Sequence, residues 1–352
     1  MTHRVVLWST GNVGRHALAG IAAHPSLELV GVWTSTPSKV GVDAGELAGI
    51  APVGVAATDS AAVLIDLKPD CVVYTAMADD RLSEAIEDLC GFLRAGINVV
   101  SSCPVFLQFP TDVVPASVTD PIVAAARSGG ASLWVNGIDP GFANDILPLT
   151  LTSVSERIDE VRCQEILDYS TYDNEKVIFD IMGFGRPGTP LLLQPGVLAL
   201  AWGSVVRQLA AGLGIDLDTV EATHTQVPAP ETFAIASGVI PEGTPAALRF
   251  EVAGMYRGRP VCVLEHITRL RPDLAPDWPQ PTGQGCYRVT VTGEPNLTLD
   301  LQLMASDGDH NTAGLKATAM RLVNAIPAVV AAPPGLLTTL DLPLITGRGL
   351  VS

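Results

Sequence analysis

The stretch Arg4-Val5-Val6-Leu7-Trp8-Ser9-Thr10-Gly11-Asn12-Val13-Gly14 decides the fold of the first part of the chain. Its first five residues predict a buried strand, and the residues from Asn12 onward predict a helix. Gly11 and Gly14 match the second and third glycines of a G-x-G-x-x-G loop, with Ser9 in place of the first. Such a loop lets the backbone approach a pyrophosphate at the start of a helix. We therefore predict a dinucleotide site, and the alternative is a tight turn that binds nothing. The predicted contacts are Ser9, Thr10, Gly11, Asn12 and Val13.

Apolar runs and helical patterns alternate as the chain continues from this loop. The expected strands are residues 4–8, 28–33, 70–75, 98–102 and 132–136. The expected helices are residues 12–24, 59–67, 80–95 and 119–127. Strands that alternate with helices in this way are typical of a parallel sheet covered on both faces. We therefore predict a Rossmann-type α/β domain over residues 1–150.

The turn after the second expected strand indicates the type of dinucleotide. NAD-binding enzymes usually place Asp or Glu there to hold the ribose hydroxyls. This chain has no acid in that turn and instead offers Ser35, Thr36 and Lys39. Hydroxyl donors and a cation suit a 2′-phosphate, so NADP(H) is preferred and NAD(H) is possible. The alternative is an ordinary polar turn with a solvated lysine. Further predicted cofactor contacts are Thr75, Ala76, Met77, Ser102, Cys103, Asn136 and Asn324.

The pattern changes after about residue 150. Residues 161–167, 223–226, 247–255, 260–270 and 287–292 predict the strands of an antiparallel sheet, and residues 191–213 predict at least one helix on it. Residues 254–258 indicate a hairpin turn. We predict an α+β substrate and dimerisation domain over 151–311, followed by a helical segment, 312–345, that packs back on the first domain. Because antiparallel sheets often keep one face free, we expect a homodimer through an apolar face of this sheet.

Composition excludes several classes of protein. Among 352 residues, 47% are hydrophobic and only 16% are charged, which predicts large buried cores. The formal net charge of −16 disfavours binding to nucleic acid or to an anionic membrane surface. The start of the chain shows no signal peptide pattern, and the six cysteines have no zinc-site spacing. We therefore expect a cytoplasmic protein without a structural metal.

Three motifs spread over the chain resemble the 2,4-diaminopentanoate dehydrogenase family. They are residues 136–142 (NGIDPGF), residues 39–47 (KVGVDAGEL), and residues 323–327 (VNAIP) with 334–336 (PGL). That family includes the native amine dehydrogenases, and its N-terminal domain is similar to that of dihydrodipicolinate reductase. The resemblance implies NAD(P)-dependent oxidative deamination of an amine, or reductive amination of a ketone or aldehyde with ammonia.

Two positions depart from the family pattern. The resemblance implies a glutamate just after the serine/cysteine run that ends the fifth strand, where this chain has Pro104. The family tends to carry Asn-Pro-Gly-Phe, where this chain has Asp139 before Pro140. Because amination chemistry needs a proton carrier, we predict that Asp139 replaces the missing carboxylate. The alternative is that Asp139 only caps a helix opened by Pro140 and Gly141. If Asp139 is not the proton carrier, the carrier must lie in the substrate domain, where Tyr169 and Glu165 are the candidates.

Several other side chains have both a functional and a structural interpretation. The candidate walls of a substrate pocket are Phe142, Tyr169, Tyr172 and Trp202, and each is equally compatible with a core position. His224 and His266 lie in strand-like runs without a neighbouring ligand residue, which favours structural roles. Asn324 either contacts the nicotinamide amide or caps the turn at Pro327. Cys103 lacks a paired base and is not expected to act as a nucleophile.

Three functions remain open on the sequence alone. The first is an amine dehydrogenase that uses a small amine or carbonyl substrate and ammonia. The second is a carbonyl or imine reductase that does not use free ammonia. The third is a catalytically silent NADP(H)-binding protein.

Overall fold

The computed structural model describes residues 2–351, which form two compact units. The first unit contains residues up to Ile138 and from Leu315 onward, and the second runs from Asp139 to Gly314. These divisions lie at 138 and 314, whereas the sequence analysis placed them at 150 and 311. No helix among residues 2–351 is both long enough and apolar enough to span a membrane.

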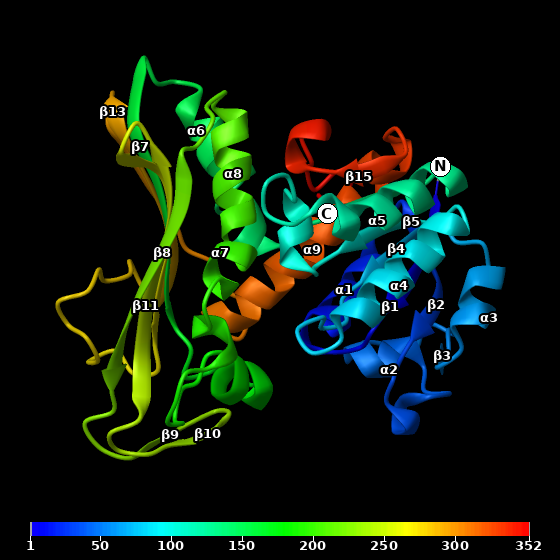
Figure 1. The fold of residues 1–352 in the computed structure, drawn as a ribbon. Helices are drawn as coiled ribbons and strands as arrows, with labels where there is room; N and C mark the ends of the chain where they lie inside the picture. The colour runs from blue at the N-terminus through cyan, green and yellow to red at the C-terminus, as the bar shows by residue number, and fades with distance from the viewer. Residues whose placement is uncertain (1, 352) are drawn as a thin grey trace. The chain divides into compact units, whose positions relative to one another are not determined.

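The first unit is built on a seven-stranded parallel sheet (Figure 1). In spatial order its strands are β15 (Gly335–Leu337), β6 (Ser132–Val135), β5 (Asn98–Ser101), β4 (Cys71–Tyr74), β1 (His3–Trp8), β2 (Leu27–Trp33) and β3 (Ala57–Thr58). Every neighbouring pair is parallel. This confirms the predicted Rossmann-type sheet and adds β3 and β15, which are too short to stand out in the sequence.

Helices cover both faces of this sheet, as the strand composition predicts. They are α1 (Asn12–Ala23), α2 (Ala44–Ala48), α3 (Ala61–Asp66), α4 (Leu82–Arg94), α5 (Ala116–Gly129) and α9 (His310–Ala331). Successive β1 residues point to opposite cores: Leu7 packs with α1 and the later part of α9, and Val6 packs with α4 and α5. A methyl group at Gly20 of α1 would lie 2.5 Å from the sulfur of Met320, which shows how closely α9 packs on α1. The predicted return of the late helix to the first domain is therefore confirmed.

The second unit contains a six-stranded mixed sheet. In spatial order its strands are β14 (Leu297–Leu301), β13 (Gly285–Glu294), β7 (Arg157–Asp168), β12 (Arg259–Arg269), β11 (Pro245–Tyr256) and β8 (Thr219–Pro228). The pair β7–β12 is parallel, so the prediction of a purely antiparallel sheet is wrong. The reason is the long helical connection from β7 to β8, which returns the chain to the same end of the sheet. The predicted hairpin turn is confirmed at Arg257 and Gly258 between β11 and β12, both with positive φ.

One face of this sheet is covered from within the unit by α6 (Ile146–Thr152), α7 (Val197–Ala201) and α8 (Gly203–Gly212) (Figure 1). The opposite face carries charged residues, including Arg162, which pairs with Glu251 and Glu265, and Arg249, which pairs with Glu265. The apolar face that the sequence analysis expected to be free for dimerisation is therefore already buried. That face is therefore not available for the expected homodimer.

The remaining elements are short. A two-stranded sheet joins β9 (Phe233–Ile235) and β10 (Gly238–Ile240). Single turns of 3₁₀ or π type are η1 (Pro37–Lys39), η2 (Val105–Gln108), η4 (Lys176–Ile181), η5 (Leu191–Leu193) and η6 (Thr339–Asp341). The segment labelled η3 (Ile138–Phe142) has non-helical backbone angles at Asp139, Pro140 and Gly141.

Candidate functional site

The glycine loop of the first unit has the geometry that a pyrophosphate site needs. Ser9 adopts a φ of 85°, a left-handed conformation that favours glycine, which explains why the motif has glycine at this place. A methyl group at Gly14 would lie 2.1 Å from the carbonyl oxygen of Ser9 and 2.9 Å from Oγ1 of Thr75, so only glycine fits there. Helix α1 begins after Gly11 without a side-chain cap. Its N-terminus therefore presents backbone N–H groups and the positive end of the helix dipole to the loop.

The predicted 2′-phosphate residues gather at this loop. The ammonium group of Lys39 donates hydrogen bonds to the carbonyl oxygen and to Oγ1 of Thr10, both at 3.2 Å. Oγ1 of Thr10 lies 3.4 Å from Oγ1 of Thr34. Ser35 and Thr36 are exposed beside them. The structure thus places a cation and several hydroxyls where the parallel strands β1 and β2 end.

Residues that follow the other parallel strands lie at the same sheet edge, because all these strands point the same way. The Thr75 hydroxyl after β4 donates to the carbonyl oxygens of Trp8 and Ser9, each at 3.1 Å. After β5, the thiol of Cys103 donates to the carbonyl oxygen of Ala76 at 2.6 Å. Burial raises the pKa of Cys103 to about 12, so it stays protonated, in agreement with the expectation that it is no nucleophile. Ala76 is buried, and Met77 and Ser102 are partly exposed.

The two predicted asparagines differ in their environment. Asn136 donates to Oγ1 of Thr339 at 3.2 Å and accepts from Nε of Arg321 at 3.0 Å, which ties the C-terminal segment to β6. For Asn324, Oδ1 is buried without a hydrogen-bond partner among residues 2–351. Helix α9 continues through Pro327 to Ala331, so the capping alternative for Asn324 is wrong. A buried amide oxygen without a partner fits a ligand that donates a hydrogen bond.

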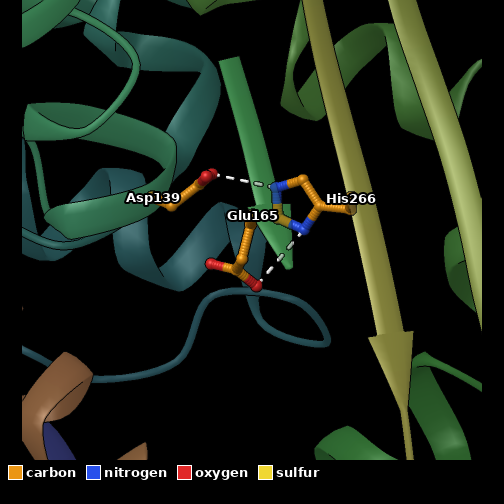
Figure 2. A group of neighbouring side chains, drawn as sticks. All are labelled: Asp139, Glu165 and His266. Carbon is orange, nitrogen blue, oxygen red and sulfur yellow. Dashed lines mark hydrogen bonds and ion pairs between the residues drawn. The ribbon is translucent and has the colours of Figure 1, made fainter. Parts of the chain in front are cut away.

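The second unit brings chemically active side chains together on one rung of its sheet. Phe250 on β11 pairs with His266 on β12, His266 pairs with Glu165 on β7, and Glu165 pairs with Tyr287 on β13. Residues that pair directly across neighbouring strands share a face. Figure 2 shows that Asp139 reaches the other side of the His266 ring. We call Asp139, Glu165 and His266 the carboxylate–histidine cluster.

The histidine of this cluster lies between its two carboxylates. Nε2 of His266 is 3.0 Å from Oδ1 of Asp139, and Nδ1 is 3.4 Å from Oε1 of Glu165 (Figure 2). The His266 side chain is 6% exposed and each carboxylate side chain 4%. An imidazole that faces a carboxylate at each nitrogen is best satisfied when both nitrogens carry a proton. The geometry therefore indicates an imidazolium ion.

The electrostatics of the cluster separate the two carboxylates. Burial acts to raise the pKa of Asp139, but the charge of His266 and hydrogen bonds from His266, Trp202 and Asn144 outweigh it and lower that pKa. Burial raises the pKa of Glu165 to about 7 against the opposing charge of His266. Burial acts to lower the pKa of His266, but Asp139 and Glu165 raise it to about 9. At neutral pH, Asp139 is therefore ionised, His266 is protonated, and Glu165 is divided between its two forms.

The segment around Asp139 does not form the predicted helix start. Asp139, Pro140 and Gly141 all have non-helical backbone angles. Helix α6 begins at Ile146, and its cap is Asp145, whose side chain accepts from the Ile146 N–H. The prediction that Pro140 and Gly141 open a helix is therefore wrong, and so is the N-cap alternative for Asp139. The side chain of Asp139 instead accepts from His266 and Trp202.

Aromatic rings surround the cluster. Phe250 stacks on His266 with ring centroids 4.6 Å apart, and Trp202 meets His266 edge-on at 4.8 Å. The Trp202 indole N–H donates to Oδ1 of Asp139 at 3.1 Å. Tyr169 and Tyr172, from the segment after β7, stack at 5.1 Å. Of the predicted pocket walls, Trp202 thus supports the cluster, the two tyrosines lie next to Glu165, and Phe142 is half-buried before α6.

The cluster also has the composition of a metal site, because one ligand atom from each residue lies within 4.8 Å of the others. The two nitrogens of His266 face different carboxylates, however, and a ring can offer only one of them to a given ion. A metal at Nε2 would have His266 and Asp139 as ligands, fewer than the three or four protein ligands of zinc sites. The geometry therefore favours proton sharing over metal binding.

Sequence reasoning missed the central residue of the cluster. His266 was assigned a structural role because no ligand residue lies near it in sequence, yet Asp139 is 127 positions away. Tyr287 and Phe250 were also missed. These residues are brought together by the register of four strands, and no local sequence pattern encodes that register.

The chain is similar to known dehydrogenases. A family profile described as the 2,4-diaminopentanoate dehydrogenase C-terminal domain matches residues 142–349. An amine dehydrogenase from Streptomyces virginiae is 41% identical over 346 residues, which cover 96% of each chain. The chain belongs to the 2,4-diaminopentanoate dehydrogenase family. The resemblance drawn from the three sequence motifs is thereby confirmed, and the chain is an oxidoreductase of this family.

Two further proteins are similar to the chain at lower identity. The 2,4-diaminopentanoate dehydrogenase of Acetoanaerobium sticklandii is 23% identical over 296 residues, which cover 82% of this chain and 75% of the relative. The solved structure of an amine dehydrogenase from Mycobacterium smegmatis matches with a TM-score of 0.79 at 23% identity, and the match covers 98% and 97% of the two chains. The second comparison confirms the fold.

Proposed function

We propose that the chain is an NAD(P)-dependent amine dehydrogenase that aminates a small ketone or aldehyde with ammonia and deaminates the amine in reverse. Family membership supports this reaction. The observation that carries the proposal is the buried carboxylate–histidine cluster of the second unit. Amination needs a group that takes a proton from ammonium and returns it to the leaving oxygen, and Pro104 cannot do this at the family's usual position.

The first unit supplies the groups that would hold the dinucleotide. The Gly11 loop and the α1 N-terminus suit the pyrophosphate, and the orphaned Oδ1 of Asn324 suits an amide donor such as that of nicotinamide. When bound, the cofactor donates or accepts the hydride. The residues proposed to hold it are Ser9, Thr10, Gly11, Asn12, Val13, Ser35, Thr36, Lys39, Thr75, Ala76, Met77, Ser102, Cys103 and Asn324. Thr339 and Arg321 hold the amide of Asn136. We therefore propose that Asn136 positions the edge of the sheet and does not contact the cofactor.

NADP(H) is the proposed preference. Lys39 lies against Thr10 in a turn that carries no acid, so a 2′-phosphate would meet a cation and hydroxyls there. NAD(H) remains compatible with the same loop, because the pyrophosphate contacts are common to both dinucleotides. We propose that Phe142, Tyr169 and Tyr172 contact the substrate.

The reaction is tested by supplying NADPH and small carbonyl compounds, such as cyclohexanone and pentanal, with ammonia, with methylamine or without an amine. We expect NADPH oxidation with ammonia and recovery of the primary amine. Equal rates without any amine would identify a carbonyl reductase instead. Tight NADPH binding without turnover under all three conditions would identify a silent binding protein.

A further inference from the structure

We propose that Glu165 carries the proton in amination and deamination, that the Tyr169 hydroxyl passes this proton between Glu165 and the substrate, and that Asp139 and His266 position Glu165. This inference rests on the proposed function. It gives different roles to Asp139 and Glu165, which sequence reasoning could not separate. It replaces Asp139, the proton carrier expected from the sequence, with a residue on strand β7.

Asp139 is surrounded by groups that only donate. The indole N–H of Trp202 donates to Oδ1 at 3.1 Å, and Nε2 of His266 lies 3.0 Å from the same oxygen. An indole N–H has no acceptor capacity, so Asp139 must stay an acceptor to satisfy it. A side-chain hydrogen bond from Asn144 acts in the same direction. Asp139 is therefore held as a carboxylate and has no neighbour, other than His266, through which a proton can leave.

Glu165 has partners of the opposite kind. The Tyr169 hydroxyl donates to Oε1 of Glu165 at 2.7 Å, and a second hydrogen bond comes from Tyr287. A hydroxyl both donates and accepts, so it can hand a proton on in either direction. Glu165 is almost fully buried, whereas Tyr169 is half-buried and stacks on Tyr172. Tyr169 is thus the more exposed member of the pair, and we place the substrate on its side.

His266 is fixed in the orientation that this division needs. Its ring stacks on Phe250, and its closer contact is the one to Asp139, at 3.0 Å against 3.4 Å to Glu165. The tighter ion pair holds the positive charge with Asp139 and leaves Glu165 the more weakly neutralised carboxylate. His266 is therefore a positioning residue, which donates toward Glu165 without taking over its proton.

The charges that face Glu165 support the same assignment. Asp139 and His266 act on it with opposite signs, and Tyr169, Tyr172 and Tyr287 surround it with hydroxyls whose own pKa values are raised by burial. Glu265, on the opposite face of β12, acts on His266 and raises its pKa. Burial raises the pKa of Glu165 to about 7, so it can both take and return a proton at neutral pH.

The proton balance of the reaction closes on one such group. Glu165 takes a proton, through Tyr169, from ammonium, and the resulting ammonia adds to the substrate carbonyl. After the added nitrogen has passed a proton to oxygen, Glu165 returns its proton to that oxygen, and the C–O bond breaks to release water. The imine carbon accepts the hydride of NADPH. One ammonium, one carbonyl compound and one NADPH thus give one amine, one water and one NADP⁺.

The test is the pH dependence of kcat/KM for deamination, with the amine that the wild type accepts and with NADP⁺. Deamination uses Glu165 as a base, so kcat/KM calculated for the unprotonated amine should fall about tenfold per pH unit below about pH 7. In Glu165→Gln the rate should fall ~10²–10⁴-fold and this acid limb should vanish. In Tyr169→Phe the rate above the limb should fall, because the proton relay is cut. The limb should also move to higher pH, because the variant lacks the hydroxyl hydrogen bond that lowers the pKa of Glu165.

Three further variants keep the test decisive. Glu165→Asp keeps a carboxyl group and should keep the limb at a reduced rate. Tyr256→Phe removes a tyrosine hydroxyl elsewhere in the same unit and should leave the profile unchanged. Asp139→Asn should keep an acid limb, because it is not the titrating group. Circular dichroism and NADPH affinity confirm that each variant is folded.

The outcomes separate this inference from the proposed function. If the wild type deaminates amines but Glu165→Gln retains the limb, or if Asp139→Asn removes it, Glu165 is not the carrier. A Tyr169→Phe profile identical to that of the wild type would remove Tyr169 from the relay. A wild type without activity on any amine overturns the proposed function itself and with it this assignment.

Discussion

Replacing Asp139 with asparagine is the most informative single change to the cluster. Asparagine has the same shape and can still accept from the Trp202 indole N–H, so the change removes the charge and little else. His266 would lose the partner that lies 3.0 Å from its Nε2. An imidazolium ion would then remain buried with Glu165 as its nearest counter-ion.

The magnitude follows from the pKa of His266. Asp139, Glu165 and Glu265 together outweigh burial and raise this pKa from 6.5 to about 9, a net effect of about 3 kcal/mol to which Asp139 is the largest contributor. Coulomb's law gives about 5.5 kcal/mol for two charges 3.0 Å apart at an effective dielectric constant of ~20, before the desolvation of both groups is subtracted. Breaking a buried ion pair from one side typically costs ~3–5 kcal/mol. We therefore expect Asp139→Asn to lower the free energy of unfolding by about 3 kcal/mol at pH 7.

Urea denaturation at two pH values measures this effect with an internal control. The folded-state pKa of His266 is raised, so its contribution to stability is complete below pH 6.5 and is lost as the pH rises through about 9. The difference between wild type and Asp139→Asn should therefore shrink between pH 7 and pH 10. Imidazole NMR should show the His266 titration moving to lower pH in the variant. A loss below about 1 kcal/mol at pH 7, or an equal loss at both pH values, would refute the ion-pair reasoning.

Two further predictions concern the cofactor and the assembly. Lys39→Ala should reduce the preference for NADPH over NADH about tenfold or more in a fluorescence titration, because one charge-assisted contact is worth ~1.5–3 kcal/mol; equal wild-type affinities for the two dinucleotides would contradict the assignment. Sedimentation should show a homodimer at micromolar concentration, and added salt should weaken it if the partly exposed arginines Arg162 and Arg249 take part in the contact. A monomer at low salt would contradict this expectation.

The first unit was largely predictable because its signals are local. The glycines after β1 and the apolar runs of β4, β5 and β6 each report on their own position in the fold. Parallel strands then bring their C-terminal residues to one edge without further information. Only the shortest strands, β3 and β15, escaped detection, since two or three residues carry no periodicity.

The second unit was less predictable because its decisive contacts depend on register. The parallel pair β7–β12 places His266 beside Glu165, and this pairing depends on how the chain between β7 and β8 returns. A shift of one residue along β12 would turn His266 to the charged face and bring Glu265 or Ile267 in its place. Asp139 was found from a sequence motif, but the motif does not reveal its contacts with Trp202 and His266.

The rung of Phe250, His266, Glu165 and Tyr287 has a consequence for how such an enzyme diversifies. Its members are held by the backbone ladder of four adjacent strands, which is the most rigid scaffold that this unit offers. The segment that carries Tyr172 and the turns up to Leu193 lies in loops and short helices instead. Substitutions and insertions in that segment can alter which substrates fit while the proton chemistry stays in place. We expect a redesign of substrate range to succeed in residues 171–193 and to fail on β7 or β12.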